Sequence, residues 1–265
     1  MTWILGYASP FGYAVSLSDI RVTFRNSDVP IELDCVQKVH AVGPFVALGF
    51  SGSVKIGFAQ VERLRRELSP MQPGVAWIPD VIAEWLPEVF REVFSEAPIH
   101  EMENRCDLMI LAAHPTHHLG NPAWPECFVY LFKSPYFEAE IVPGLRLVSI
   151  GSGNGLEAHR ILVQSFLDQP FDLIKMETSG SGMGSQILDY VVTDTLKKNN
   201  SKGISPHLHI CFVRRGSITF GRNDHATYHP DGSRIEFRMP DVATTYDEYR
   251  RLIESRGLVP GAGIS

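Results

Sequence analysis

Amphipathic patterns follow one another in pairs along this chain of 265 residues. Alternating apolar residues around Pro-Gly turns predict two β-hairpins, and apolar residues at helical spacing then predict two helices. More strands, a second pair of helices and two final strands follow. Strands are predicted at 3–7, 13–18, 35–42, 45–51, 107–113, 128–132, 137–141, 145–150, 208–214 and 217–220, and helices at 54–68, 79–94, 156–167 and 185–198. Since each element is apolar on one face, the sequence predicts an α+β fold: a four-layer αββα sandwich of two antiparallel sheets flanked by helix pairs.

The sequence changes character after Arg222. It becomes polar and rich in turn residues through Asp224 and Pro230, and then predicts one further helix at 246–256. We therefore expect a main domain over residues 1–222 and a C-terminal extension over residues 223–265 that packs on it.

The charge balance limits the kinds of partner. The chain has 24 Lys and Arg against 30 Asp and Glu, a formal net charge of -6, and no basic stripe that could displace phosphate counterions. No apolar run approaches the roughly 20 residues that span a bilayer, and Asp19 precedes the first basic residue, unlike in a signal peptide. We therefore expect no nucleic-acid or membrane partner and a cytoplasmic location.

The four cysteines are far apart and lie in apolar, strand-like runs without a Cys-x-x-Cys motif. They are Cys35, Cys106, Cys127 and Cys211. This pattern is typical of reduced core thiols, although the even count leaves disulfides as an alternative.

Thr2 is the strongest candidate in this sequence for a catalytic residue. It is small and follows Met1, so removal of Met1 by methionine aminopeptidase is expected to leave Thr2 with a free α-amine. An α-amine has an ordinary pKa of about 8, so part of it is neutral and can accept the proton of the Thr2 hydroxyl. One residue would then supply both nucleophile and base. The simpler explanation is that threonine is merely a suitable residue after an initiator methionine.

Four short motifs accompany Thr2 in a fixed order. They are Asp19-Ile20-Arg21-Val22-Thr23, Gln37-Lys38-Val39, Ser51-Gly52-Ser53 and Ile150-Gly151-Ser152-Gly153. In this arrangement the chain resembles the proteasome family, which includes the bacterial HslV peptidase and whose β subunits begin with threonine on a strand. The chain also resembles, in its general character, the small bacterial proteasome homologue called Anbu.

The resemblance implies a role for each motif. Thr2 would be the nucleophile, Asp19 would orient Lys38, and the Lys38 cation would lower the proton affinity of the amine. The Gly52 N–H would stabilise the oxyanion, and such a backbone donor typically contributes roughly 3 to 4 kcal/mol. Ser152 would form a hydrogen bond near the amine and Lys38. Ser201 matches a family serine after the last long helix. The resemblance also places five residues at the substrate pocket: Val22, Thr23, Val36, His40 and Phe50. An aromatic residue at such spacing is as often part of the core.

The sequence departs from the family in two places. Lys197 to Gly203 replaces an Asp-x-x-Ser-Gly-Gly motif, and the aspartate has no counterpart, as in HslV. The interval from Asp19 to Lys38 is longer than in the family and requires an enlarged loop around Arg25 to Pro30.

Two other patterns suggest ligand sites. His114, His117 and His118, with His207 and His209, could bind a metal, but a surface loop explains them without one. The glycine-rich stretch 179–185 could hold phosphate at a helix N-terminus, yet it lacks the lysine and strand of a phosphate-binding loop, so a flexible connector is the preferred interpretation.

The resemblance predicts a threonine-type peptidase that needs no cofactor and cleaves peptides or unfolded proteins through an acyl-enzyme on Thr2. It also implies a ring-like or stacked homo-oligomer, with an ATPase unfoldase as a partner. Two alternatives stay open: a non-catalytic proteasome-like subunit with a structural or binding role, and a small-molecule amidohydrolase on the same fold.

Overall fold

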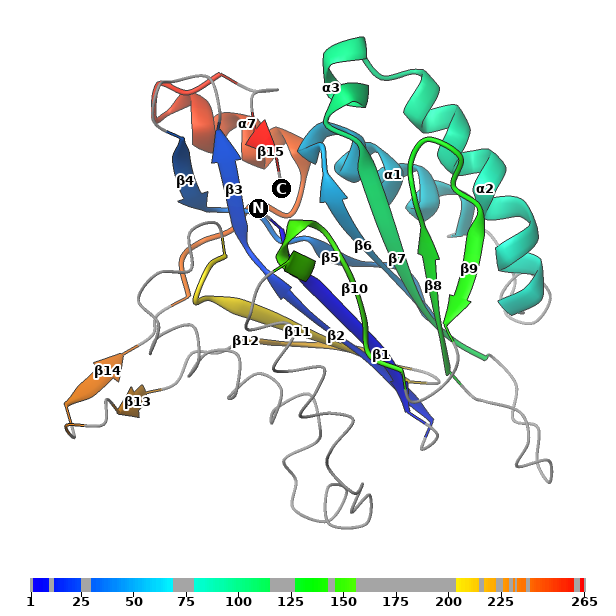
Figure 1. Cartoon of the computed structure of the whole chain (residues 1–265), viewed down its shortest axis with the longest axis horizontal. Coiled ribbons are helices and arrows are strands. Elements are labelled where there is room, and N and C mark those ends of the chain that lie inside the picture. Colours follow the sequence, from blue (N-terminus) through cyan, green and yellow to red (C-terminus); the bar gives the residue numbers. More distant parts are fainter. Residues whose placement is uncertain are drawn as a thin grey trace.

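The structure is a computed structural model of the whole chain (Figure 1). It describes residues 2–9, 12–24, 30–68, 79–114, 127–142, 146–155, 204–214, 217–222, 226–228, 231, 233–236, 239–259 and 263–264.

The first sheet is formed around the N-terminal hairpin. Its five strands run antiparallel in the order β10-β1-β2-β11-β12. Their bounds are β1 Ile4–Ser9, β2 Tyr13–Asp19, β10 Val148–Ile150, β11 Leu208–Arg214 and β12 Ser217–Arg222. Every residue of the central strand β2 is buried, so Asp19 at its end is held in a rigid, water-excluded position.

The second sheet is also antiparallel and has five strands, in the order β5-β6-β7-β8-β9. Their bounds are β5 Val39–Gly43, β6 Val46–Gly52, β7 Cys106–Ala113, β8 Cys127–Phe132 and β9 Ala139–Val142. Successive residues of a strand face opposite sides of the sheet, and here both sides are apolar. Leu108 and Ile110 pack in one core, whereas Met109 and Leu111 pack in the other.

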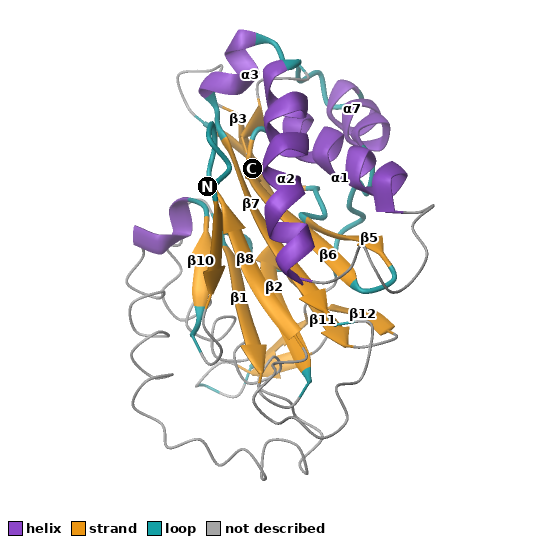
Figure 2. Cartoon of the chain, turned by 90° about the vertical axis from the view of Figure 1, so that its right-hand side faces the viewer, coloured by secondary structure: helices purple, strands orange, loops and turns teal. Residues whose placement is uncertain are grey.

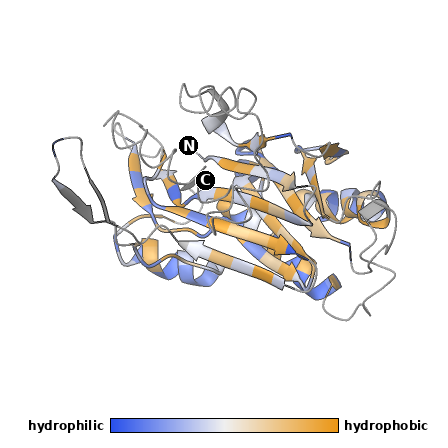
Figure 3. Ribbon diagram, turned by 90° about the horizontal axis from the view of Figure 1, so that it is seen from below, coloured by the Kyte–Doolittle hydropathy of each residue, from blue (hydrophilic) through white to orange (hydrophobic). Residues whose placement is uncertain are grey.

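The two sheets pack on each other through one of these cores. Side chains from both sheets meet there, including Ile4 and Val213 from the first sheet and Met109 from the second. The strands of both sheets are largely hydrophobic in Figure 3. Gly6 allows the close approach, because a Cβ at that position would overlap the Met109 side chain.

Helices cover the outer face of the second sheet (Figure 2). They are α1 Val54–Leu68, α2 Pro79–Ser95 and the short α3 Ile99–Glu103. Phe58 of α1 and Phe90 of α2 are fully buried in the core that these helices form with the sheet. The hydroxyl of Ser53 accepts from the Ile56 N–H at 3.1 Å and so caps the start of α1.

A smaller three-stranded sheet, ordered β15-β3-β4, lies beside the N-terminal hairpin. Its strands are β3 Arg21–Phe24, β4 Ile31–Asp34 and β15 Gly263–Ile264. The remaining elements are the β13 (Ala226–Tyr228) and β14 (Arg234–Glu236) hairpin, the 3₁₀ turn η1 Ser152–Gly155 and the helix α7 Tyr246–Glu254.

The fold is α+β with antiparallel sheets, as the sequence predicted. The helices predicted at 156–167 and 185–198 and the glycine-rich stretch 179–185 lie outside the described residues. The loop predicted around Arg25 to Pro30 lies, except for Pro30, outside the described residues, and the strands on either side of it, β3 and β4, pair with each other. In the described part of the chain, no helix combines the length and the apolar character needed to cross a membrane.

Candidate active site

Thr2 lies at the start of the first sheet, two residues before β1, and its side chain has no exposed surface. Its backbone is held by the turn that follows β10. The Thr2 N–H donates to Ser152 Oγ at 3.2 Å, and the Thr2 carbonyl accepts from the Gly153 N–H at 3.0 Å. Gly151 makes this close contact possible, because its φ is +93° and a Cβ there would overlap the Thr2 carbonyl.

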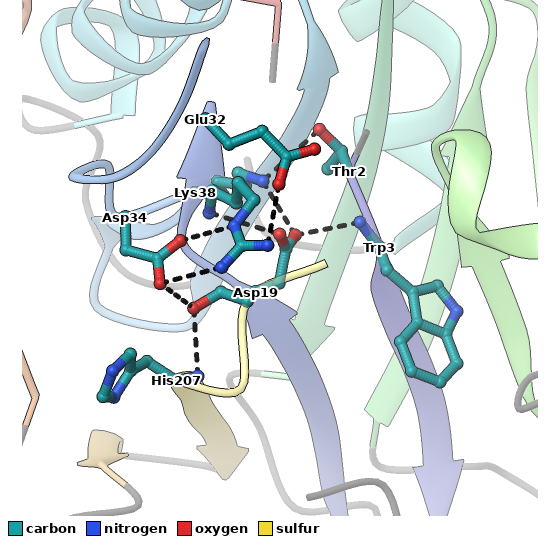
Figure 4. Close-up of polar contacts among 9 residues, drawn as sticks. Thr2, Trp3, Asp19, Glu32, Asp34, Lys38 and His207 are labelled. Atoms are coloured by element: carbon teal, nitrogen blue, oxygen red, sulfur yellow. Dashed lines mark hydrogen bonds and ion pairs between the residues drawn. The ribbon is translucent and has the colours of Figure 1, made fainter. Parts of the chain in front are cut away.

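Lys38 connects Thr2 to Asp19. Its Nζ lies 3.3 Å from Thr2 Oγ1 and 2.7 Å from Asp19 Oδ1 (Figure 4). None of the three side chains is exposed to solvent. The hydroxyl, the ammonium and the carboxylate therefore form one continuous chain of polar contacts inside the protein.

The Asp19 carboxylate is fixed by backbone donors as well as by Lys38. Its Oδ1 accepts from the Trp3 N–H at 2.9 Å, and its Oδ2 accepts from the Arg21 N–H at 3.2 Å. The Asp19 N–H in turn donates a hydrogen bond to the Trp3 carbonyl at 3.1 Å. These bonds tie the end of β2 to the residue after Thr2, so the carboxylate cannot turn away from Lys38.

Burial changes the acid strength of Lys38. Loss of hydration in the interior lowers the pKa of Lys38 below its ordinary value, while the Asp19 carboxylate acts in the opposite direction. Lys38 therefore releases its proton more readily than an exposed lysine would. It does so within hydrogen-bonding distance of the Thr2 hydroxyl.

The backbone around Lys38 is held on two sides. The Lys38 carbonyl accepts from the Phe50 N–H of β6 at 3.1 Å. On the other side, Val36 forms a parallel bridge with Ala243, whose N–H donates to the Cys35 carbonyl at 2.8 Å and whose carbonyl accepts from the Gln37 N–H at 3.0 Å. A segment more than 200 residues away in the sequence thus helps to position Lys38.

Gly52 ends β6, the strand that contacts Lys38 through Phe50. Its φ of +97° favours glycine, and a Cβ would overlap the Arg105 carbonyl. The neighbouring Ser53 N–H donates to that same carbonyl at 2.8 Å, and the Ser53 hydroxyl bonds to the buried carboxylate of Glu101 at 2.5 Å. The backbone that carries the expected oxyanion donor is therefore firmly held.

An ionic network continues from Asp19 along the small sheet. The Arg21 guanidinium lies 2.8 Å from Asp34 and 2.9 Å from Glu32. Ser205 donates to Asp34 at 2.7 Å and accepts from the His207 N–H at 3.0 Å (Figure 4). Sequence reasoning missed this network, although the alternation Glu32-Leu33-Asp34 is a signal for a strand with one acidic face.

The five residues expected at the substrate pocket, Val22, Thr23, Val36, His40 and Phe50, are all buried in the structure. Val22, Val36 and Phe50 belong to the core beneath α1. The His40 ring stacks on Phe50 with 5.9 Å between ring centroids and contacts Phe58 edge-on. Burial lowers the pKa of His40 from 6.5 to about 4, and its Nε2 bonds to the Gln37 carbonyl at 2.8 Å, so this ring is neutral at physiological pH.

The structure thus brings Thr2, Asp19, Lys38 and Ser152 together by direct hydrogen bonds. Ser201 lies outside the described residues, as do His117 and His118. Among the residues that are described, no three His, Cys, Asp or Glu side chains are arranged to hold a metal ion. All four cysteines are free and buried, as the prediction of core thiols requires.

Comparison with known proteins adds no assignment to this geometry. No protein-family model matches the sequence, and no curated protein matches it either.

Proposed function

We propose that this protein is an N-terminal threonine hydrolase of the proteasome type, which cleaves peptide bonds through an acyl-enzyme on Thr2 after removal of Met1. The observation that carries the proposal is the buried contact chain from Thr2 Oγ1 through Lys38 Nζ to Asp19 Oδ1. A buried lysine that contacts a hydroxyl and a carboxylate is typical of sites that activate nucleophiles.

The proposed mechanism starts with the freed α-amine of Thr2. A positive charge on Lys38 disfavours protonation of this amine, so a larger fraction of it is neutral and able to accept the hydroxyl proton. The direct contact of 3.3 Å between Lys38 Nζ and Thr2 Oγ1 lets this positive charge stabilise the oxygen as its proton moves to the amine. Oγ1 then attacks the peptide carbonyl, the Gly52 N–H stabilises the oxyanion, and the amine protonates the leaving nitrogen. Water finally hydrolyses the ester.

The arrangement of the remaining residues supports this mechanism. Asp19 holds Lys38 in one orientation, and Ser152 Oγ accepts from the Thr2 nitrogen, which is the atom that must act as base. Because these groups are fixed before substrate binds, little reorganisation is needed when charge develops on the substrate.

The proposal extends to the complete fold and to assembly. We propose that the complete fold is the four-layer αββα sandwich of the N-terminal-nucleophile type. The same resemblance implies a ring-like or stacked homo-oligomer that encloses the site, with peptides or unfolded proteins supplied by an ATPase unfoldase.

One observation favours a second candidate, a non-catalytic subunit on the same fold. Thr2 has no exposed surface, so no substrate reaches it in this conformation. In that case Met1 is retained, its peptide bond blocks the amine, and the contact chain has a structural role only.

A single experiment separates the two candidates. The purified full-length protein is analysed by intact mass before and after incubation with a threonine-directed epoxyketone. The hydrolase predicts loss of Met1 and one adduct per chain, and Thr2→Ala provides the unlabelled control. Retention of Met1 together with no adduct would overturn the proposed function.

A further inference from the structure

A buried carboxylate lies next to the backbone of the expected oxyanion donor. Glu101 of α3 is only 1% exposed, and its Oε2 accepts a hydrogen bond from the Ser53 hydroxyl at 2.5 Å. Ser53 directly follows Gly52, whose N–H stabilises the oxyanion in the proposed mechanism. Glu101 is thus one hydrogen bond and one residue away from the oxyanion donor.

Stability alone does not explain a carboxylate at this position. Its second oxygen, Oε1, is buried and has no hydrogen-bond partner among the described residues. This oxygen lies 3.8 Å from Nε2 of His100, whose side chain is 66% exposed, so solvent weakens any attraction between the two groups. A buried carboxylate without a close cation costs the fold free energy that an apolar side chain would not. The bond to Ser53 is therefore the feature that calls for a role.

The end of α3 holds Ser53 at a second point. The Ser53 N–H donates to the Arg105 carbonyl at 2.8 Å. Arg105 has a φ of +58°, which is uncommon for a residue with a Cβ, and it lies where α3 leads into β7 (Figure 1). The next residue, Cys106, pairs with Gly52. One short helix and the residue after it therefore fix both the side chain and the backbone of Ser53.

The Ser53 hydroxyl also connects Glu101 to the start of α1. It donates to the carboxylate and accepts from the Ile56 N–H at 3.1 Å. A hydroxyl that donates to a carboxylate is a stronger acceptor, because hydrogen bonds in a chain polarise one another. The first turn of α1 contains no acidic residue, so Glu101 supplies the negative charge that a helix N-terminus favours. The junction between β6 and α1 is thereby held from α3.

We propose that Glu101 is a positioning residue, which keeps the Gly52 N–H directed at the oxyanion through its bond to Ser53. The bond prevents the backbone at the junction from rotating when negative charge develops on the substrate, and a donor that is fixed in advance stabilises that charge more than one that must reorient. Since the role is one of position, a neutral acceptor at residue 101 should replace the carboxylate. The inference rests on the proposed function for the role of Gly52, whereas the hold on the backbone can be measured without turnover.

The experiment compares variants that all lack the buried charge. Glu101→Gln keeps an oxygen that can accept from Ser53, whereas Glu101→Leu and the double variant Glu101→Gln with Ser53→Ala each remove the bond by a different route. Gln60→Met is the matched control, because Gln60 is also buried in α1 and donates to the Phe90 carbonyl, about two turns beyond Ser53. Hydrogen–deuterium exchange of residues 50–56 reports the backbone directly.

A second measurement reports the oxyanion. Each protein is incubated with an acetylated tripeptide aldehyde of leucine, or with the corresponding alcohol, and each inhibition constant is obtained from the slowing of epoxyketone labelling. Only the aldehyde forms a tetrahedral adduct, so the ratio of the two constants measures oxyanion stabilisation apart from ordinary peptide binding. The pH midpoint of labelling reports the Thr2 amine and should stay the same, which separates a displaced donor from a damaged nucleophile.

We expect the two variants without the bond to lose about ten-fold or more of the aldehyde preference relative to Glu101→Gln. Their exchange at residues 50–56 should be about ten-fold faster or more, while Gln60→Met should match the unchanged protein in both measurements. An unchanged aldehyde preference in a folded variant without the bond would overturn the inference, even if exchange is faster, since the bond would then serve the fold alone. If the unchanged protein is not labelled, the proposed function fails as well, so the two failures are distinguishable.

Discussion

Lys38 Nζ lies 2.7 Å from Asp19 Oδ1, and neither side chain has any exposed surface. Burying two charges costs hydration energy that their attraction only partly returns, so such a pair is weak evidence for stability by itself. Removal of one partner is much more costly, because the other charge is left in the interior without compensation. This asymmetry gives a test that separates a structural role of the pair from a catalytic one.

We expect Lys38→Met to destabilise the protein by about 3 to 5 kcal/mol, because the Asp19 carboxylate stays buried without its cation. The double variant Asp19→Asn with Lys38→Met removes both charges, and its amide oxygen can still accept from the Trp3 N–H. The double variant should recover most of the lost stability in urea unfolding, but its epoxyketone labelling should stay much slower than that of the unchanged protein. Recovery of labelling together with stability would show that the pair serves folding alone.

The pH dependence of labelling should identify the effect of the Lys38 charge on the Thr2 amine. The reactive form is the deprotonated base, so the labelling rate should rise with pH and then level off. The nearby cation should place the midpoint below the ordinary amine pKa of about 8, and the charge-free double variant should move it up toward that value and lower the maximum rate. The measurement is the second-order labelling rate at a series of pH values. An unchanged midpoint would contradict a role of Lys38 in setting the proton affinity of the amine.

Gly151 and Gly257 form a matched pair for testing the turn that holds Thr2. Both have positive φ, at +93° and +71°, but a Cβ at Gly257 meets nothing within 4 Å, whereas one at Gly151 overlaps the Thr2 carbonyl. Gly257→Ala should therefore cost about 1 kcal/mol from backbone strain alone. Gly151→Ala should cost about 3 kcal/mol or more, because the turn must also shift. The labelling rate of Gly151→Ala should also fall at least ten-fold. Equal unfolding midpoints for the two variants would argue against the close contact between Gly151 and Thr2.

His40 should make stability fall in mild acid. Its pKa is about 6.5 when unfolded and about 4 in the fold, because the ring is buried, its Nδ1 has no hydrogen-bond partner among the described residues, and Arg65 and His209 oppose its charge. As the pH falls from about 6.5 to about 4, the unfolded chain binds a proton that the folded chain does not, so stability present at neutral pH is lost. This contribution is up to about 3 kcal/mol. The variant His40→Gln should show a correspondingly flatter curve of unfolding free energy against pH.

Local patterns were sufficient to predict most strands of the two large sheets. Alternation of side chains between turn residues predicted β2 and β6, although both strands are buried along almost their whole length. Helical spacing predicted α1 and α2, because burial on one face dominates the pattern of a helix that covers a sheet. β9 starts at Ala139, two residues later than predicted, because Phe137 lies in a turn with a φ of +52°. The short elements α3 and β15 could not be predicted, since five and two residues are too few to show a period.

The candidate site could be predicted only where its members are side chains in recognisable motifs. Thr2, Asp19, Lys38 and Ser152 were predicted from such motifs, and the structure joins them by hydrogen bonds. The backbone bonds from Trp3 to Asp19 and from Gly153 to Thr2 involve no characteristic side chain, so no sequence pattern indicates them. Likewise, nothing near Ala243 shows that it pairs with the segment before Lys38.

The bridge between Val36 and Ala243 has a consequence for how the protein matures on the ribosome. Lys38 cannot take up its supported position until residue 243 has been translated and has left the exit tunnel, although Thr2 emerges among the first residues. A nascent chain would therefore still lack this support of Lys38 when Thr2 has already emerged. If Thr2 is the nucleophile of the proposed hydrolase, the late arrival of this short segment would keep it inactive while the protein is being made.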